Sequence, residues 1–385
     1  MKYIGTMSLG IKAPIIKPNT DLVEIIIESI KNAIQYENLK LDNNDILCIT
    51  ESVVAISQGN FATVNDISVD VKQKFSNEVV GLVFPILSRN RFSNLLKGIK
   101  GGVKKVVLQL SYPADEVGNR LISEEELLNA KLNPYQDTLT LFEFRKLFPN
   151  TKHLFTGVDY IEVYKDIIGN ESEIIFANDP NAILKYTDEV IVASIHNRKF
   201  VKERLLQAGA KKVLCLDEIL NKPINGSGYN SDYGLLGSNF MGEDSVKLFP
   251  RDCFTLVEKV KGRVKEEFGK DIEVMVYGDG AFKDPRGGIW ELADPVVSPG
   301  YTLGLQGTPN ELKFKFLARN VKNEDEIKNL IKNKTSDAKY TNDALGTTPR
   351  QLVDLLGSLA DLTSGSGDKG TPFVLIKNYF TNYAN

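Results

Sequence analysis

Residues 173–217 have the sequence EIIFANDPNAILKYTDEVIVASIHNRKFVKERLLQAGAKKVLCLD. Three apolar, β-rich runs, EIIFAND, EVIVAS and KKVLCLD, start about 20 residues apart and are separated by helical patterns. Strands that alternate with helices are typical of parallel α/β sheets. We therefore predict a small Rossmann-like unit of three parallel strands within residues 171–225.

Polar residues follow each of these strands. Asn178 and Asp179 follow the first, Ser194 to Arg198 the second, and Asp217 and Glu218 the third. Ligands bind at the carboxyl ends of parallel strands, although such residues also cap the helices that come next. We expect capping for most of them and ligand binding for His196 and Arg198.

The segments around this unit have shorter patterns. These predict a helix at 21–36, a buried strand at 45–50, a short strand at 53–57 and a strand at 103–110. Ser123 and Glu126 have the spacing of a capping box, which predicts the start of a helix. Residues 221–231, rich in Gly, Asn and Ser, indicate a linker.

The loop at 111–120 carries four candidate substrate-binding residues: Asp115, Glu116, Asn119 and Arg120. A purely structural loop is the alternative interpretation.

The charge balance of the chain excludes some function classes. Its 385 residues include 50 acidic and 47 basic side chains, for a net charge of −3. Such a balance gives no electrostatic reason to bind nucleic acid or a membrane surface. No run is apolar enough to span a bilayer, and the N-terminus lacks a signal-peptide pattern. We expect a cytoplasmic protein whose cysteines (Cys48, Cys215 and Cys253) are buried and unpaired.

The chain has only two histidines, His153 and His196. This excludes an H-E-x-x-H zinc site and disfavours a Ser-His-Asp triad. Any metal ion must then be held by oxygen ligands, which favours Mg²⁺ or Mn²⁺.

The segment 272–300, IEVMVYGDGAFKDPRGGIWELADPVVSPG, concentrates charged residues behind a predicted strand. Gly278 and Gly280 flank Asp279 and allow a sharp turn close to a ligand. A carboxylate in such a turn is a common way to hold a divalent ion. Lys283, Arg286, Glu291 and Asp294 follow, and we expect a functional loop here rather than a solvated one.

The segment 347–372 predicts a helix and a glycine-rich loop. Thr348 is the expected N-cap and Pro349 the first helical residue. Five leucines share one face (Leu352, Leu355, Leu356, Leu359 and Leu362), and four polar residues share the other (Arg350, Asp354, Ser358 and Asp361). The loop Gly365–Gly370, with Gly367 and Lys369, has free N–H groups for an anion. A merely solvated face is the alternative.

A further candidate segment, 231–239, contains Asp232, Ser238 and Asn239. The chain has no Walker A loop and no G-x-G-x-x-G after a strand, so a nucleotide must be held in another way.

Four stretches together resemble the coenzyme F420 gamma-glutamyl ligase family. They are GIKAPIIKP (10–18), the strand at Asp45 leading to Ser57-Gln58-Gly59, GDGAFKDPRGG (278–288) and DLLGSLADLTSGSGDKGTP (354–372). Members of this family attach L-glutamate to the precursor of a deazaflavin coenzyme, using GTP and a divalent metal. Long bacterial members resemble this chain nearly end to end.

The resemblance implies a fold and a domain plan. The fold is α+β or mixed α/β: a ligase core with mixed sheets, plus the inserted Rossmann-like unit. Residues 1–110 begin the core, 111–170 form a connecting or substrate loop region, 171–225 form the insertion, and 226–385 complete the core with the metal and nucleotide site.

The resemblance also implies roles for individual residues. Asp279 matches a metal-binding aspartate, Asp354 an acidic position on the last helix, and Ser238-Asn239 a Ser-Asn pair. Leu236 stands where short members carry a metal-binding aspartate, and Asp232 is the candidate replacement.

We expect the metal (Mg²⁺ or Mn²⁺) at Asp279, Asp232 and Asp354. The expected nucleotide- and substrate-binding residues, beyond the loop 111–120, are Lys17, Ser57, Gln58, His196, Arg198, Ser238, Asn239, Gly278, Gly280, Asp361, Gly367 and Lys369. Lys283, Arg286, Glu291 and Asp294 are the expected catalytic residues.

The expected reaction is activation of an acceptor carboxylate by GTP or ATP as an acyl phosphate, followed by attack of the glutamate amine. The sequence leaves the acceptor open between a deazaflavin precursor and a folate. It also leaves open a regulatory protein that binds nucleotide or folate without turnover. A redox enzyme that binds a dinucleotide is disfavoured by the missing glycine fingerprint. We expect a homodimer that acts on small molecules.

Overall fold

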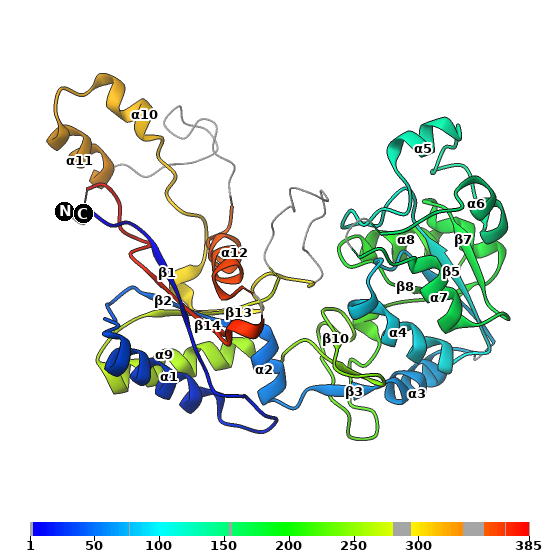
Figure 1. The fold of residues 1–385 in the computed structure, drawn as a ribbon, viewed down its shortest axis with the longest axis horizontal. Coiled ribbons are helices and arrows are strands. Elements are labelled where there is room, and N and C mark those ends of the chain that lie inside the picture. Colours follow the sequence, from blue (N-terminus) through cyan, green and yellow to red (C-terminus); the bar gives the residue numbers. More distant parts are fainter. Residues whose placement is uncertain are drawn as a thin grey trace. The chain divides into compact units, whose positions relative to one another are not determined.

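The computed structural model describes residues 3–76, 78–153, 156–279, 294–333, 350–365 and 367–384. These residues form two compact units. Unit 1 contains the described residues up to Ser57, from Asp252 to Asp279 and from Val296 onward, and unit 2 contains Gln58–Arg251 with Asp294 and Pro295. Each unit is described by itself (Figure 1).

Unit 1 is built on a mixed sheet of five strands in the order β1-β14-β2-β12-β13. The strands are β1 (Met7–Ile11), β2 (Ile46–Thr50), β12 (Glu273–Tyr277), β13 (Gly300–Tyr301) and β14 (Phe373–Lys377). β2 and β12 run parallel, and the other neighbouring pairs are antiparallel. The mixed sheet confirms the predicted fold class.

Helices cover both faces of this sheet (Figure 1). The α-helices of unit 1 are α1 (Leu22–Glu37), α2 (Glu51–Ser57), α9 (Cys253–Phe268), α10 (Phe314–Leu317), α11 (Glu324–Asn333) and α12 (Leu352–Ser364). Three short 3-10 turns are η3 (Leu303–Leu305), η4 (Ala318–Asn320) and η6 (Gly367–Lys369). α1 and α9 pack on one face of the sheet and α12 on the other.

The sequence explains why α1 forms and where it lies. Asp21 caps the helix by accepting hydrogen bonds from the N–H groups of Val23 and Glu24. Its apolar residues recur at helical spacing, and Ile26, Ile27 and Ile30 are fully buried against the sheet.

Two predictions in unit 1 are corrected by the structure. Residues 53–57 lie in helix α2 and not in a strand, because a short apolar run does not distinguish the two. Helix α12 begins at Leu352 with Gln351 as its N-cap, so Arg350 lies outside the helix and pairs with Glu311. Thr348 and Pro349 lie outside the described residues.

The apolar face of α12 differs in one position from the prediction. Leu352 and Leu356 are buried as expected, and Gly357 and Ala360 join them. Leu362 is instead exposed. Small residues therefore replace leucine where the helix approaches the strands most closely.

Lys377 in β14 makes the best-buried ion pair of unit 1 among the described residues. Its Nζ lies 2.6 Å from the Oδ2 atom of Asp45 and 2.9 Å from that of Asp42, and it donates to the carbonyl of Lys40. Burial lowers the pKa of Lys377, but hydrogen bonds to the two carboxylates outweigh it, so that the pKa is raised. The ammonium therefore stays charged and neutralises the buried Asp45 carboxylate.

We predict that Lys377→Met destabilises unit 1 by about 3–5 kcal/mol, because Asp45 is left buried without its cation. Urea denaturation monitored by circular dichroism measures the loss. Lys31→Met, which removes an exposed pair with Glu267, is the matched control and should change stability far less. Equal effects of the two changes would contradict this account.

Unit 2 contains two sheets. One has six strands, β6 (Leu139–Thr140), β7 (Glu173–Phe176), β5 (Lys105–Leu110), β4 (Val79–Val83), β8 (Glu189–Val192) and β9 (Lys212–Cys215), in this spatial order. The other has three antiparallel strands, β10 (Asn239–Phe240), β11 (Ser245–Lys247) and β3 (Phe61–Thr63). All pairs of the larger sheet are parallel except the edge pair of β6 with β7.

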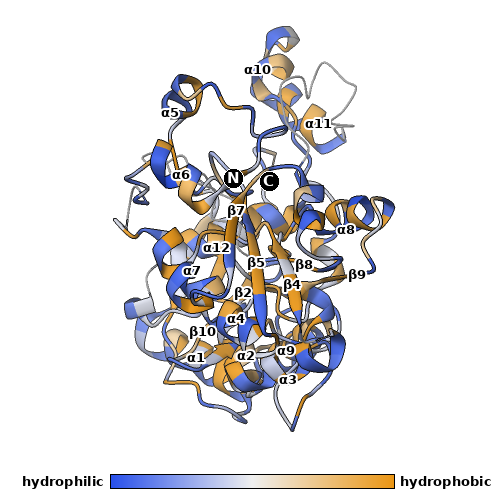
Figure 2. Ribbon diagram, turned by 90° about the vertical axis from the view of Figure 1, so that its right-hand side faces the viewer, coloured by the Kyte–Doolittle hydropathy of each residue, from blue (hydrophilic) through white to orange (hydrophobic). Residues whose placement is uncertain are grey.

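Helices lie on both faces of the larger sheet. The α-helices are α3 (Val64–Lys74), α4 (Arg89–Gly101), α5 (Glu124–Asn129), α6 (Leu141–Leu147), α7 (Tyr160–Ile168) and α8 (Arg198–Gln207), and the 3-10 turns are η1 (Pro180–Lys185) and η2 (Leu216–Glu218). α4 and α7 pack on one face, and η1 and α8 on the other. The strands between them are largely hydrophobic (Figure 2), as buried parallel strands are.

The five parallel strands have a doubly wound order. Along the chain they are β4, β5, β7, β8 and β9, and in space they follow the order 3-2-1-4-5. The order reverses between β4 and β8, and such a reversal creates a crevice at the carboxyl ends of the two strands. The polar residues that follow β8 lie at this reversal.

The predicted three-strand unit is part of this larger sheet. β7, β8 and β9 are parallel strands as predicted, but β5 and β4 lie between β7 and β8. The compact unit consequently runs from Gln58 to Arg251 and differs from the predicted boundaries at 110, 170 and 225. The apolar runs of β4 and β5 indicate burial, but nothing in them specifies which strand they pair with.

Candidate active site

Unit 1 has a pocket where three distant chain segments converge. The cavity has a volume of about 380 Å³ and is lined by Ala13–Ile16, by four residues at the end of β2 and in α2 (Thr50, Ser52, Val53 and Ile56) and by six from the loop after α12 (Ser364, Gly365, Gly367, Gly370, Thr371 and Pro372). All three segments lie in stretches that carry the family resemblance.

The sheet order brings these segments together. β14 pairs antiparallel with both β1 and β2, so the carboxyl ends of β1 and β2 lie beside the amino end of β14. Backbone hydrogen bonds then fix the pocket walls: Ala13 N–H donates to the carbonyl of Gly370 at 3.1 Å, and Thr50 N–H to that of Pro372 at 3.0 Å. The pocket is therefore a direct result of the strand order.

The pocket is lined by both polar and apolar residues. The polar ones with a hydroxyl group are Thr50, Ser52, Ser364 and Thr371. The apolar ones include Pro14, Ile15, Ile16, Val53 and Ile56, and Ile15 is 87% exposed. An apolar side chain this exposed at a pocket rim is available to a ligand.

Lys369 lies next to Gly365, one of the residues that line the pocket. Gly365 has a positive φ of 62°, and a Cβ added there would lie 2.6 Å from the Nζ atom of Lys369. The ammonium group of Lys369 thus lies against Gly365. A residue with a side chain at position 365 would collide with it. Gly367 lies in the same turn, η6.

Tyr277 lies beneath the pocket, at the end of β12. It is paired in register with Thr50 and only 1% exposed, and its hydroxyl makes no well-aligned hydrogen bond. Burial raises the pKa of Tyr277, while the hydroxyls of Ser364 and Thr50 lie close enough to lower it slightly. A neutral donor therefore lies beside two residues that line the pocket.

The predicted metal residues fall in both units. Asp279, two residues beyond Tyr277, and Asp354 in α12 are half-buried residues of unit 1, and burial raises the pKa of Asp354. Asp361 is half-buried on the same helix face as Asp354. Asp232 is exposed and belongs to unit 2. Leu236 is buried in the core of unit 2, which explains why no ligand stands there.

Four predicted residues lie outside the described ones: Gly280, Lys283, Arg286 and Glu291. Asp294 is described and is buried in unit 2, where its Oδ1 lies 2.9 Å from the Nη1 of Arg91. This ion pair favours a structural role for Asp294.

Three further predicted residues of unit 1 have local contacts. Lys17 is exposed just beyond the pocket segment, and its carbonyl accepts a hydrogen bond from Thr20. The Ser57 hydroxyl donates to the carbonyl of Val54 within α2. Gly278 N–H donates to the carbonyl of Val297 at 2.8 Å and so fixes the turn before Asp279.

In unit 2, Gln58 joins two chain segments. Its Nε2 donates to the carbonyl of Arg251 at 2.6 Å, and its Oε1 accepts from the N–H of Arg251 at 2.9 Å. Ser238 is buried with an unpartnered hydroxyl, and the Oδ1 of Asn239 accepts from the N–H of Phe240.

The loop 111–120 ties the strand ends of unit 2 together. The Asp115 carboxylate accepts four hydrogen bonds, from Leu87 N–H, Val117 N–H, and both the backbone and side-chain amides of Asn119. Burial raises the pKa of Asp115 in spite of these donors. Arg120 makes an exposed ion pair with Glu124. These contacts favour the structural interpretation of the loop.

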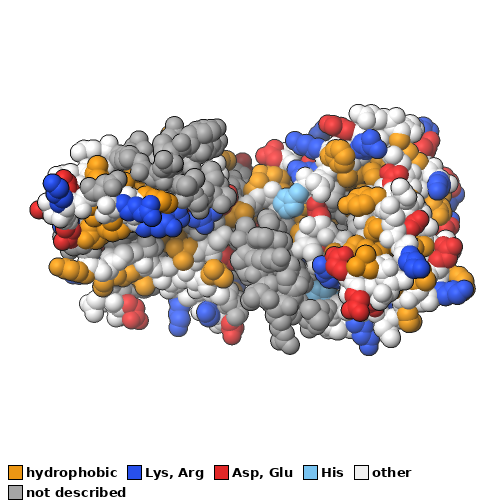
Figure 3. Space-filling view, turned by 90° about the horizontal axis from the view of Figure 1, so that it is seen from above, with side chains coloured by type: hydrophobic (Ala, Val, Ile, Leu, Met, Phe, Trp, Pro, Cys, Tyr) orange, Lys and Arg blue, Asp and Glu red, His pale blue; other side chains and the backbone are white. Residues whose placement is uncertain are grey.

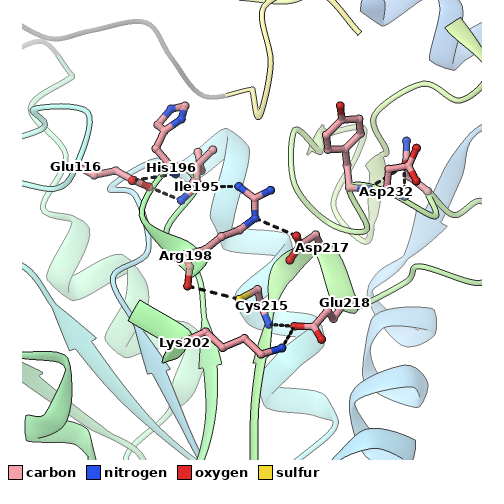
Figure 4. A network of polar contacts seen from close by, with 11 residues as sticks. Glu116, Ile195, His196, Arg198, Lys202, Cys215, Asp217, Glu218 and Asp232 are labelled. Carbon is pink, nitrogen blue, oxygen red and sulfur yellow. Dashed lines mark hydrogen bonds and ion pairs between the residues drawn. The ribbon is translucent and has the colours of Figure 1, made fainter. Parts of the chain in front are cut away.

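Glu116 of this loop reaches the end of β8, where its carboxylate accepts hydrogen bonds from the N–H groups of Ile195 and His196 (Figure 4). Nearby, Arg198 donates to the Oδ2 of Asp217 at 2.9 Å and to the carbonyl of Ile195. N–H groups that bind phosphate in many doubly wound sheets are thus occupied by an internal carboxylate. This arrangement disfavours a dinucleotide at the strand reversal.

Cys215, Asp217 and Glu218 form the only three-ligand group found among the described residues. Its carboxylates are already paired, Asp217 with Arg198 and Glu218 with Lys202 at 2.6 Å (Figure 4). Burial also raises the pKa of Cys215 to about 12, so the thiol stays protonated. The group therefore has the properties of a structural network rather than a metal site. All three cysteines are buried and unpaired, as predicted.

A family model described as F420-0:Gamma-glutamyl ligase matches residues 10–378. The chain belongs to the F420-0:gamma-glutamyl ligase family. Membership implies gamma-glutamyl ligase activity on small-molecule substrates. A comparison with curated proteins found no match.

None of the helices in the described ranges has the length and apolar character that a bilayer crossing needs. In the described part of the face shown in Figure 3, acidic, basic and apolar side chains are intermixed.

Proposed function

We propose that this ligase uses GTP or ATP to join L-glutamate to a carboxylate acceptor through an acyl phosphate. The observation that carries the proposal is the unit 1 pocket, which is lined by residues 13–16 together with the end of α12 and the loop after it. Its hydroxyl groups and the nearby Lys369 suit phosphate or carboxylate oxygens. Its apolar side chains suit the flat ring of a deazaflavin precursor or a folate.

The reaction proceeds in two steps. An oxygen of the acceptor carboxylate attacks the γ-phosphorus, a new P–O bond forms, and the bond to the leaving nucleoside diphosphate breaks. The glutamate amine then attacks the acyl carbon, a C–N bond forms, inorganic phosphate leaves, and the ammonium proton passes to a base. Lys369 and the hydroxyl groups of the pocket orient the anionic groups and stabilise the charge that develops on them.

The acidic residues of unit 1 fit a hard divalent cation. Asp279, Asp354 and Asp361 offer carboxylate oxygens, the ligand type that Mg²⁺ and Mn²⁺ prefer. The described residues around Asp279 show no three-ligand group, so the ion would share its ligands with water and with phosphate oxygens, as Mg²⁺ commonly does. When bound, such an ion neutralises the charge on the phosphates.

The proposal is tested by incubating the full-length chain with L-glutamate, Mg²⁺ or Mn²⁺, and either GTP or ATP. The acceptor is either the deazaflavin precursor or tetrahydrofolate. Mass spectrometry should show the acceptor gaining one glutamyl unit, together with nucleoside diphosphate and phosphate. The acceptor that gains mass identifies the substrate. Nucleotide binding without any mass gain on either acceptor would instead indicate a regulatory protein.

Tyr277→Phe provides a test of the pocket itself. We predict a fall in kcat/KM of about tenfold, because the hydroxyl lies beside Ser364 and Thr50 and positions these two residues of the pocket. The same change should alter stability little, because the hydroxyl makes no well-aligned hydrogen bond in the protein. Thermal unfolding and steady-state kinetics separate the two effects, and an unaltered kcat/KM would contradict the role.

The assembly and location of this ligase are also proposals. We propose a homodimer, from the family resemblance, and a cytoplasmic location, from the composition and the free cysteines. Light scattering of the purified chain tests the first, and cell fractionation tests the second.

A further inference from the structure

Unit 2 contains a second cavity, remote in sequence from the pocket of unit 1. It has a volume of about 450 Å³ and lies between α4, α7 and β10. Its lining consists of Arg89, Asn90, Ser93, Asn94 and Lys97 from α4, Val163 and Ile167 from α7, and Phe240 from β10. Its size is that of a small-molecule site.

One buried hydroxyl in this cavity lacks a partner. Ser93 is 7% exposed, and its Oγ makes no hydrogen bond with the protein. The side-chain amide of the neighbouring Asn94, by contrast, has hydrogen-bond partners, since it donates to the carbonyls of Gly242 and Ser245. Because buried polar groups are normally hydrogen-bonded, this hydroxyl leaves an unused donor beside the cavity.

The charges around this cavity have one sign. Two of the lining residues are cationic, Arg89 and Lys97, and none of them is acidic. Lys97 donates to the carbonyl of Glu243, whereas Arg89 is exposed and has no hydrogen bond or ion pair within the described parts of the chain. Arg89 is therefore available to an anion.

The remaining wall is apolar. Val163 and Ile167 lie one helical turn apart on α7, and Phe240 faces them from β10 with 48% of its surface exposed. These side chains provide a surface for a hydrocarbon chain or ring, with the cationic end of the cavity on α4.

We propose that this cavity binds an amphipathic small-molecule carboxylate. Its carboxylate pairs with Arg89 and accepts a hydrogen bond from Ser93, and its apolar part packs against Val163, Ile167 and Phe240. The site is distinct from the pocket of unit 1 and does not depend on the proposed ligase reaction.

The test uses isothermal titration calorimetry of the full-length chain with decanoate below its micelle concentration. Decyltrimethylammonium, with the same tail and the opposite charge, is the control ligand. We expect decanoate to bind one to one and the ammonium compound not to bind. Absence of decanoate binding, or equal binding of both compounds, would overturn the proposal.

Variants locate the site. Arg89→Gln should weaken decanoate binding about tenfold, because it removes the charged partner of the carboxylate. Phe240→Ala should also weaken it, through loss of the apolar wall. Lys199→Gln, which removes another exposed cation from a helix of unit 2, should leave the affinity unchanged. If Lys199→Gln weakens binding as much as Arg89→Gln, the site does not exist as described.

Discussion

Asp279→Asn is expected to reduce kcat of the glutamylation reaction by about a thousandfold. The carboxylate follows β12 directly, in the part of unit 1 where the parallel strands β2 and β12 both end. A divalent cation held there would supply several kcal/mol of charge stabilisation to the proposed phosphoryl transfer, and asparagine keeps the shape of aspartate without its charge. Coupled measurement of nucleoside diphosphate release gives kcat.

Two controls make this result specific. Asp271→Asn removes a carboxylate of the same unit that is exposed and pairs with Lys261 and Lys265, so its kcat should be close to that of the wild type. Raising the Mn²⁺ concentration should partly restore the Asp279 variant if the lost group is a metal ligand. A fully active Asp279→Asn protein would remove the metal assignment.

Gly234→Val is expected to prevent stable folding of unit 2. Gly234 has a φ of 50°, and a Cβ there would lie 2.6 Å from the carbonyl oxygen of Leu216 and 2.7 Å from that of Asp217, with Ile219 also in contact. The strain of a left-handed backbone and the collision with three fixed carbonyl groups both destabilise the folded variant. We expect a loss of more than about 4 kcal/mol, since overpacking and backbone strain each cost 1–3 kcal/mol.

The matched control is Gly226→Val. Gly226 has a φ of 81° in the same unit, but a Cβ there has nothing within 4 Å. Only the backbone strain then remains, about 1–2 kcal/mol. Urea denaturation with a probe in unit 2 compares the variants. If Gly234→Val and Gly226→Val lost similar unfolding free energy, the close packing of the 230–238 turn on the end of β9 would not contribute to the stability of unit 2.

Local features of the fold were predictable because they depend on neighbouring residues. Helix α1, strands β2, β5 and β12, and the capping box at Ser123 and Glu126 all follow the patterns of the sequence. Residues 53–57 were misread as a strand, because five residues carry too little periodicity to distinguish a strand from a helix.

The architecture of unit 2 was harder to predict from the sequence. Placing β4 and β5 between β7 and β8 depends on pairings between strands that are distant in the sequence, such as that of Gly81 in β4 with Val190 in β8. An apolar run indicates that a strand is buried, but it does not indicate which strand lies beside it. For this reason, the sequence predicted only β7, β8 and β9 as one unit.

The roles expected of the site residues stay predictions. Gly367 of the predicted loop lines the unit 1 pocket, together with residues 13–16, and Lys369 lies beside Gly365 of the same loop. Tyr277 was missed, because a tyrosine at the end of an apolar strand resembles any core residue until its hydroxyl is found without a partner. Asp115 and Asn119 were predicted to bind substrate because the loop that contains them is rich in polar residues. Their polar atoms instead form hydrogen bonds within the loop.

The central claim is that unit 1 binds the reacting phosphate groups, with the cation at Asp279. Anomalous diffraction from crystals grown with Mn²⁺ and a non-hydrolysable nucleotide tests it most directly. The account predicts a manganese peak within bonding distance of Asp279 and a triphosphate at the pocket of Thr50, Ser364 and Lys369. Manganese and nucleotide bound together elsewhere in the molecule would contradict it.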